Sequence, residues 1–161
     1  MAPPTTVGKT SSILFVCLGN ICRSPMAEGV FRSLAQQTGL DRTMTIDSAG
    51  TGAWHVGDPP DPRAVAKAAE HGVDISGQRA RQFAVSDFER FDLILAMDAS
   101  NLETLKSRSP DPFVSGAHRF MEFALDEPID VPDPYYGGAD GFETVYRMLE
   151  NGCSSILKRL G

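Results

Sequence analysis

Residues 13–26, ILFVCLGNICRSPM, constrain the fold more than any other part of this 161-residue chain. Residues 13–18 form an unbroken apolar run with the length and β-branched character of a buried strand in a parallel sheet. A helix should start soon afterwards, because Ser24 is a good N-cap residue and Pro25 suits the first helical position. The segment therefore predicts a strand, a tight turn and a helix N-terminus in direct succession.

The turn, residues 17–23, has the composition of an oxyanion-binding loop. Gly19 and Asn20 are residue types that accept left-handed backbone angles, so successive backbone N–H groups can converge on one point. The N-terminus of the following helix adds positive potential there. These N–H groups and the fixed charge of Arg23 favour the thiolate form of Cys17, which makes Cys17 a candidate nucleophile. Because Arg23 can offer two parallel N–H donors, the expected ligand is a phosphate monoester.

The spacing C-x5-R is weak evidence by itself. Three cysteines and 11 arginines in 161 residues would produce it by chance in roughly one such chain in five. The apolar strand before it, the Gly-Asn pair inside it and the Ser-Pro pair after it are independent requirements. Together they disfavour the alternative that Cys17 is an ordinary buried cysteine.

The stretch CLGNICRSPMAE resembles the signature of the low-molecular-weight protein tyrosine phosphatases. The resemblance extends across nearly the whole chain after the first dozen residues. Its further stretches are DSAGT, RARQ, MDASN, DPYYG and FETVY, at residues 47–51, 79–82, 97–101, 133–137 and 142–146. It implies hydrolysis of phosphotyrosine in proteins through a phosphocysteine intermediate.

Hydrophobic periodicity in the rest of the chain alternates between strands and helices. Strands are predicted at residues 13–18, 43–48, 91–97 and 119–123, and helices at residues 24–38, 62–71 and 141–160. Two short helices are also predicted, one that starts at a capping box of Ser86 and Glu89 and one after Asp98. This alternation predicts an α/β fold, a single open, mostly parallel four-stranded sheet flanked by helices on both faces, with the phosphate-binding loop after the first strand. We expect a flexible leader at residues 1–12 and a single phosphatase domain at residues 13–161.

Composition narrows the possible partners and location. A net charge of −6 and a pI near 5.0 argue against non-specific nucleic-acid binding and against a polybasic membrane contact. Three cysteines, two of them in one turn, make no disulfide framework and favour a reducing, cytoplasmic location. There is no apolar segment long enough to insert into a membrane and no Cys-His metal spacing. We assume a monomer whose partner is a phosphotyrosine-containing protein substrate.

The family's general-acid motif matches DPYYG, so the resemblance assigns Asp133 as the acid that protonates the leaving group and then activates water. Composition alone does not separate Asp133 from Asp126 or Asp130. No metal or organic cofactor is needed for this chemistry. The resemblance places the phosphate on seven consecutive residues, Leu18, Gly19, Asn20, Ile21, Cys22, Arg23 and Ser24.

Other residues are expected to support or surround that loop. By resemblance, Ser48 hydrogen-bonds Asn20 and helps to hold the turn, and many relatives have a histidine in the same role where this chain has Gln78. Trp54 lies in a loop of small and polar residues, which favours a wall of the substrate cleft over a core position. The resemblance places Tyr135 and Tyr136 opposite Trp54, and Ile21 gives an apolar contact suited to a phenyl ring. His55 is expected to be a surface residue. Asp98, in the MDASN stretch, resembles a family position near the rear of the loop, but a helix cap is the preferred explanation.

Three alternatives stay open on the sequence alone. Cys22 either fills space beneath the loop or traps oxidised Cys17 as a reversible disulfide. A thioredoxin-coupled arsenate reductase shares this fold and cysteine loop, but it requires resolving cysteines near residues 80–95, where this chain has none. A non-catalytic phosphate-binding module would keep the loop, although binding alone requires neither a nucleophile nor a distant acid.

Overall fold

The computed structural model describes residues 11–110, 116–136 and 139–160. Its elements, with η for a 3-10 helix, are β1 (Ser12–Cys17), α2 (Arg23–Thr38), η1 (Leu40–Arg42), β2 (Thr45–Gly50), α3 (Pro62–Glu70), α4 (Asp87–Arg90), β3 (Leu93–Ala96), α5 (Ala99–Arg108), β4 (Ala117–Arg119), α6 (Phe120–Leu125), η2 (Pro134–Tyr136) and α7 (Ala139–Leu160). Residues 1–10 of the expected leader lie outside the described part, and Ser12 already belongs to β1. Within the described ranges, no helix is both long and apolar enough to cross a membrane.

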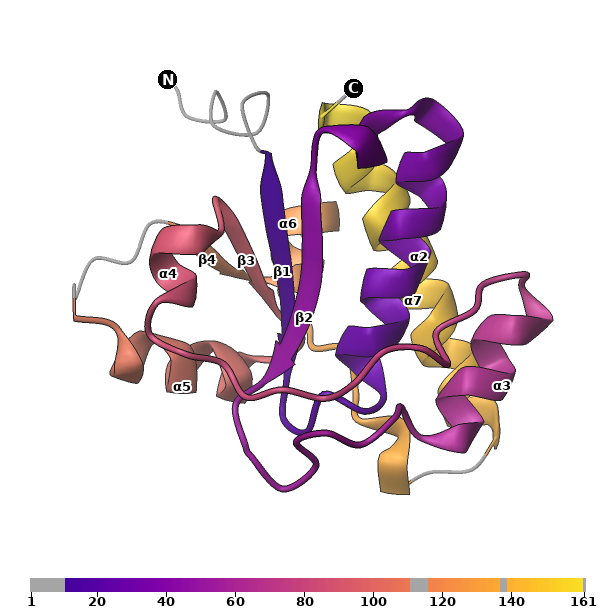
Figure 1. Cartoon of the computed structure of the whole chain (residues 1–161), viewed down its shortest axis with the longest axis horizontal. Helices are drawn as coiled ribbons and strands as arrows, with labels where there is room; N and C mark the ends of the chain where they lie inside the picture. The colour runs from indigo at the N-terminus through magenta and orange to yellow at the C-terminus, as the bar shows by residue number, and fades with distance from the viewer. Residues whose placement is uncertain (1–10, 111–115, 137–138, 161) are drawn as a thin grey trace.

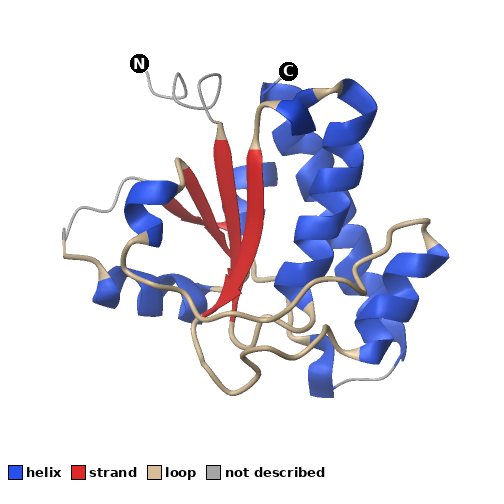
Figure 2. Cartoon of the chain, in the orientation of Figure 1, coloured by secondary structure: helices blue, strands red, loops and turns tan. Residues whose placement is uncertain are grey.

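The four strands form one open sheet in the order β2-β1-β3-β4, and every neighbouring pair is parallel. Phe15 in β1 lies opposite Ser48 in β2 and Leu95 in β3. Helices α2, α3 and α7 lie on one side of the sheet and α4 and α5 on the other (Figures 1 and 2). The predicted α/β fold is confirmed. Because β2 and β3 flank β1 on opposite sides, the carboxyl end of β1 is where an open α/β sheet forms a ligand-binding crevice.

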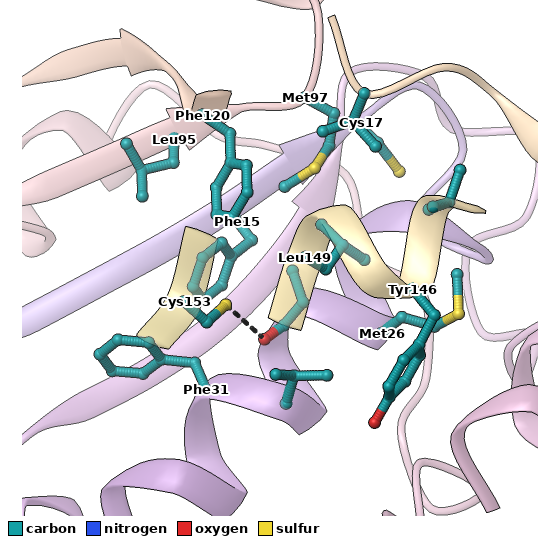
Figure 3. Packing of buried hydrophobic residues seen from close by; sticks show 14 of the residues in the cluster. Phe15, Cys17, Met26, Phe31, Leu95, Met97, Phe120, Tyr146, Leu149 and Cys153 are labelled. Atoms are coloured by element: carbon teal, nitrogen blue, oxygen red, sulfur yellow. Dashed lines mark hydrogen bonds between the residues drawn. The ribbon is translucent and has the colours of Figure 1, made fainter. Parts of the chain in front are cut away.

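The apolar run of β1 is buried on both faces of the sheet. Phe15 belongs to the larger core, where its ring centroid lies 5.8 Å from that of Phe31 and 6.2 Å from that of Phe120 (Figure 3). Its neighbours Leu14 and Val16 belong to the smaller core on the opposite face. All six residues of β1 are buried, so the strand that leads into the oxyanion loop is held by packing on both sides.

The strand predicted at residues 119–123 is wrong. Strand β4 ends at Arg119, and Phe120 begins helix α6. The buried side chains of α6 are Phe120, Met121 and Ala124, a spacing that places the first and last on one face of a helix. A short apolar run does not distinguish a buried strand from a buried helical turn, and here the helical packing prevails.

Two predicted helix caps are also wrong. Helix α2 begins at Arg23, so Ser24 lies inside the helix, and no side chain caps its N-terminus. The Ser24 hydroxyl is used instead in the site described below. The capping box expected from Ser86 and Glu89 is absent, because Ser86 has helical backbone angles and makes no side-chain cap hydrogen bond.

Alanine substitution at two glycines of α7 should change the stability of the protein in opposite directions. A Cβ at Gly152 would overlap the fully buried Phe120 ring, so Gly152→Ala should lower the free energy of unfolding by about 1–3 kcal/mol. Gly141→Ala is the matched control, because its Cβ would lie 3.9 Å from Pro134 Cβ and the higher helix propensity of alanine contributes up to about 1 kcal/mol. Urea unfolding, monitored by circular dichroism, measures the stability of both variants. Equal stability of the two would contradict this account of the α6–α7 contact.

Candidate active site

The oxyanion loop lies between β1 and α2 and is pressed against the end of β2. The Cys17 carbonyl accepts a hydrogen bond from Thr51 N–H at 2.9 Å, and the Leu18 carbonyl accepts one from Gly52 N–H at 2.9 Å. A Cβ at Gly50 would lie 2.8 Å from the Leu18 carbonyl oxygen, so only glycine permits this approach. Asn20 has a φ of 58°, a left-handed conformation that the surrounding contacts must hold.

The sulfur of Cys17 lies inside this loop and is almost fully buried. The backbone N–H of Asn20 donates to Sγ at 3.3 Å, and the Ser24 hydroxyl lies 3.1 Å from Sγ. The hydroxyl that sequence reasoning assigned to a helix cap therefore contacts the candidate nucleophile. The sulfur thus lies against a backbone donor of the loop and a hydroxyl of α2.

The side chain of Asn20 connects the loop to two other segments. Its Nδ2 donates to Ser24 Oγ at 2.8 Å and to Ser48 Oγ at 3.0 Å, and its Oδ1 accepts from Arg81 N–H at 3.0 Å. The structure thus brings together Asn20 and Ser48, as expected from the sequence. It does not bring Gln78 to Asn20, because Gln78 Nε2 donates to the carbonyl of Pro25 at 3.0 Å.

Arg23 is buried behind the loop among acidic groups. Its Nη1 donates to Asp98 Oδ2 at 2.7 Å and to the Val131 carbonyl at 3.0 Å, and Nη2 lies 3.7 Å from Asp133 Oδ2. Burial acts to lower the pKa of Arg23, but Cys17 and the two carboxylates raise the pKa above its ordinary value. The guanidinium therefore supplies a permanent positive charge at this site.

Asp98 has two functions, of which sequence reasoning preferred one. Its Oδ1 accepts from Asn101 N–H at 2.7 Å, so the predicted cap of α5 is confirmed. Its Oδ2 orients Arg23, a contact between residues 75 positions apart. The MDASN stretch was the only available signal for this second function, because a local sequence pattern does not reveal a long-range partner.

A cleft of about 280 Å³ opens above the loop. Its walls and floor are formed by Cys17, Leu18, Gly19, Ile21, Cys22, Arg23, Trp54, His55, Asp133 and Tyr135. Trp54 is 72% exposed and Tyr135 is 40% exposed, so both present aromatic surface at the cleft rather than in the core. Tyr136 belongs to η2, and the prediction for its side chain lies outside the described part of the chain.

His55 has a larger part in the cleft than the sequence suggested. Its imidazole lines the cleft and packs over Gly19, where an added Cβ would lie 3.1 Å from the ring. Its Nδ1 lies 3.3 Å from Asp58 Oδ2, which fixes the ring orientation. The signal that could have found His55 was its position directly after Trp54 in the same short loop.

The three candidate acids occupy different surroundings. Asp133 lines the cleft, and its Oδ1 accepts from Tyr135 N–H at 3.0 Å. Asp130 instead accepts from Ala99 N–H and from Arg119, and Asp126 ends α6 with a φ of 57°. Of the three, the structure places Asp133 at the candidate site, with its side chain 32% exposed.

Cys22 lies at the edge of the same cleft as a free thiol. Burial, followed by the negative charge of Asp61, raises the pKa of Cys22 well above its usual range. The Cys22 thiol is therefore protonated at neutral pH. The reversible disulfide with Cys17 stays one of the two alternatives for Cys22. The described residues contain no group of three or more His, Cys, Asp or Glu side chains arranged to hold a metal ion.

Comparison with known proteins places these residues in a family. Residues 12–161 match the family described as low molecular weight phosphotyrosine protein phosphatase. The chain belongs to this family. Its members are protein tyrosine phosphatases, a class of phosphoric monoester hydrolases, and membership makes the chain an enzyme of that class.

Individual phosphatases agree with the assignment over almost their full length. A low molecular weight protein-tyrosine-phosphatase of Bacillus subtilis is 44% identical over 147 residues, which cover 91% of this chain and 93% of that protein. A phosphatase of Schizosaccharomyces pombe is 46% identical, with 94% and 98% covered. The crystal structure of a tyrosine phosphatase of Entamoeba histolytica, with Hepes in its active site, has a TM-score of 0.87 and 38% identity, and the match covers 93% of this chain and 96% of that chain.

Proposed function

We propose that the enzyme hydrolyses phosphotyrosine in proteins through a phosphocysteine intermediate. The observation that carries the proposal is the meeting of Cys17 and Arg23, at the two ends of the oxyanion loop, with the distant Asp133 in one cleft. A thiol inside a ring of N–H groups, a buried guanidinium and a carboxyl group at the cleft wall have complementary functions in transfer of a phosphoryl group.

In the first step, Cys17 Sγ attacks phosphorus, and an S–P bond forms as the P–O bond to the tyrosine oxygen breaks. The loop N–H groups and Arg23 hold the equatorial oxygens, on which negative charge is spread. Asp133 donates a proton to the departing phenolate, whose conjugate acid has a pKa of ~10. Tyrosine leaves, and the phosphoryl group remains on sulfur.

In the second step, the Asp133 carboxylate takes a proton from a water molecule, which attacks the phosphocysteine. The S–P bond breaks, inorganic phosphate forms and the Cys17 thiolate is restored. The same carboxyl group can act in both steps, because the proton that it gives to tyrosine in the first step is replaced by the proton that it takes from water in the second.

Two features support an aryl phosphate rather than a smaller ester. Trp54 and Tyr135 present aromatic faces at the cleft, where a phenyl ring can stack. Ile21, which is 9% exposed, adds an apolar contact beside the loop. A phosphoserine side chain has no ring to stack on these walls.

An arsenate reductase is the less supported alternative. That reaction requires further thiols that can reach the nucleophile, and Cys153 is fully buried in α7, with its thiol 3.8 Å from the Ala27 carbonyl (Figure 3). All three cysteines are free thiols, in keeping with a reducing compartment, and we propose that the enzyme acts in the cytoplasm.

The test is hydrolysis of phosphotyrosine, phosphoserine and phosphoarginine peptides of one sequence by the reduced enzyme in buffer that contains a metal chelator. We expect turnover of the phosphotyrosine peptide, with kcat/KM at least about 100-fold higher than for the other two, because only a phenyl ring fills the aromatic cleft. Turnover of none of the three, together with binding of inorganic phosphate, would instead support the non-catalytic module.

A further inference from the structure

Arg81 contacts the active-site region through its backbone on two sides. Its N–H donates to Asn20 Oδ1 in the oxyanion loop at 3.0 Å. Its carbonyl accepts from the N–H of Gly50 at 2.9 Å, and Gly50 is the residue of β2 that presses against the loop. A displacement of Arg81 would therefore reach the loop both through Asn20 and through the end of β2.

The side chain of Arg81 fixes this backbone position. Its Nη1 and Nη2 donate to the two oxygens of Asp87 at 3.0 and 3.2 Å, and its Nε donates to Asp47 Oδ2 at 3.1 Å. Two parallel N–H donors on one carboxylate define a single orientation of the guanidinium. Burial acts to lower the pKa of Arg81, but Asp87 and Asp47 raise it, so the charge is retained.

Asp87 is the buried partner of this ion pair, and its side chain is 0% exposed. Besides Arg81, it accepts from Ala84 N–H at 2.8 Å and from Arg90 Nη1 at 3.3 Å. A fully buried carboxylate is costly unless it is paired and hydrogen-bonded, and here its partners fix the segment that reaches the oxyanion loop.

The loop requires such external support. Asn20 has left-handed backbone angles, which cost energy in a residue other than glycine and persist only when neighbouring groups enforce them. Its N–H is also the group that donates to Cys17 Sγ. The orientation of the Asn20 peptide therefore affects both the nucleophile and the ring of N–H donors that receives phosphate.

We infer that Arg81 is a positioning residue for phosphoryl transfer, because its ion pair with Asp87 fixes the backbone N–H that holds Asn20 and thereby the oxyanion loop. The inference rests on the proposed function, since it concerns how that site is kept in a binding geometry. Arg81 does not line the cleft, so its effect is exerted through Asn20 and Gly50.

The test measures KM, kcat and the inhibition constant of vanadate for Arg81→Met and Arg81→Lys. We expect Arg81→Met to lower kcat/KM by about 10- to 100-fold and to weaken vanadate binding, because small displacements of a binding loop have effects of this size. Arg81→Lys keeps the charge beside Asp87 without the paired donors, so it should fold and show a smaller change in the same direction. Arg90→Met is the matched control, since it removes another partner of Asp87 that does not contact the loop.

If Arg81 only stabilised the fold, the kinetic constants of its variants would show a different pattern. Fewer folded molecules would lower Vmax, whereas KM and the vanadate inhibition constant of the folded fraction would not change. Unchanged constants in Arg81→Lys, or equal changes in Arg90→Met, would overturn the inference even if Arg81→Met fails to fold. Failure of the wild type to bind vanadate would instead overturn the proposed function along with this role, so the two failures are distinguishable.

Discussion

Cys17→Ser should abolish phosphotyrosine hydrolysis while the cleft continues to bind oxyanions. A serine hydroxyl is far less nucleophilic than a thiolate, so we expect turnover to fall by about 10⁴-fold or more. The loop N–H groups and Arg23 stay in place, because the substitution changes a single atom of an almost fully buried side chain. Hydrolysis and isothermal titration with vanadate measure the two properties separately.

Cys153→Ala is the matched control for this experiment. Cys153 is buried in α7, and its thiol faces the Ala27 carbonyl rather than the cleft. The variant should keep phosphotyrosine hydrolysis within about threefold of wild type, with a modest loss of stability from the small cavity it leaves. Comparable activity in Cys17→Ser and wild type would exclude a phosphocysteine intermediate and assign the nucleophile elsewhere.

The parts of this molecule that were predictable from sequence are those with local signals. Three signals within 14 residues predict three elements: an apolar run predicts strand β1, a Gly-Asn pair the oxyanion loop, and a Ser-Pro pair helix α2. The order of secondary structure then determines the sheet, because parallel strands joined by helices have few arrangements. The same local rules failed at Ser24, whose hydroxyl faces Cys17 and Asn20 because the turn brings all three together.

The parts that were not predictable depend on contacts between distant segments. Asp98 reaches Arg23 across 75 positions, and Arg81 reaches Asn20 across 61. In both cases the residue also satisfies a local interaction, a helix cap for Asp98 and an ion pair with Asp87, six positions away, for Arg81. When a local interaction already explains why a residue is present, a second, long-range interaction is missed, because sequence patterns report only neighbours along the chain.

Asp133→Asn should slow hydrolysis to an extent that depends on the leaving group. With phosphotyrosine the departing phenolate requires a proton, so loss of the acid should lower kcat by about 10²- to 10⁴-fold. With an aryl phosphate whose phenol is much more acidic, the leaving group departs without that proton, and the first step should be nearly unchanged. Burst kinetics on both esters separate formation of the phosphocysteine from its hydrolysis, which the variant should slow for either substrate.

Asp130→Asn is the control that isolates this effect, because it changes a nearby acid of the same loop that binds Ala99 N–H and Arg119 outside the cleft. It should show no dependence on the leaving group. Asparagine at position 133 also removes a carboxyl group 3.7 Å from Arg23, so a loss caused only by altered phosphate binding would be equal for both esters. An equal loss would therefore make Asp133 a binding residue, whereas a loss confined to the poor leaving group in the first step identifies a proton donor.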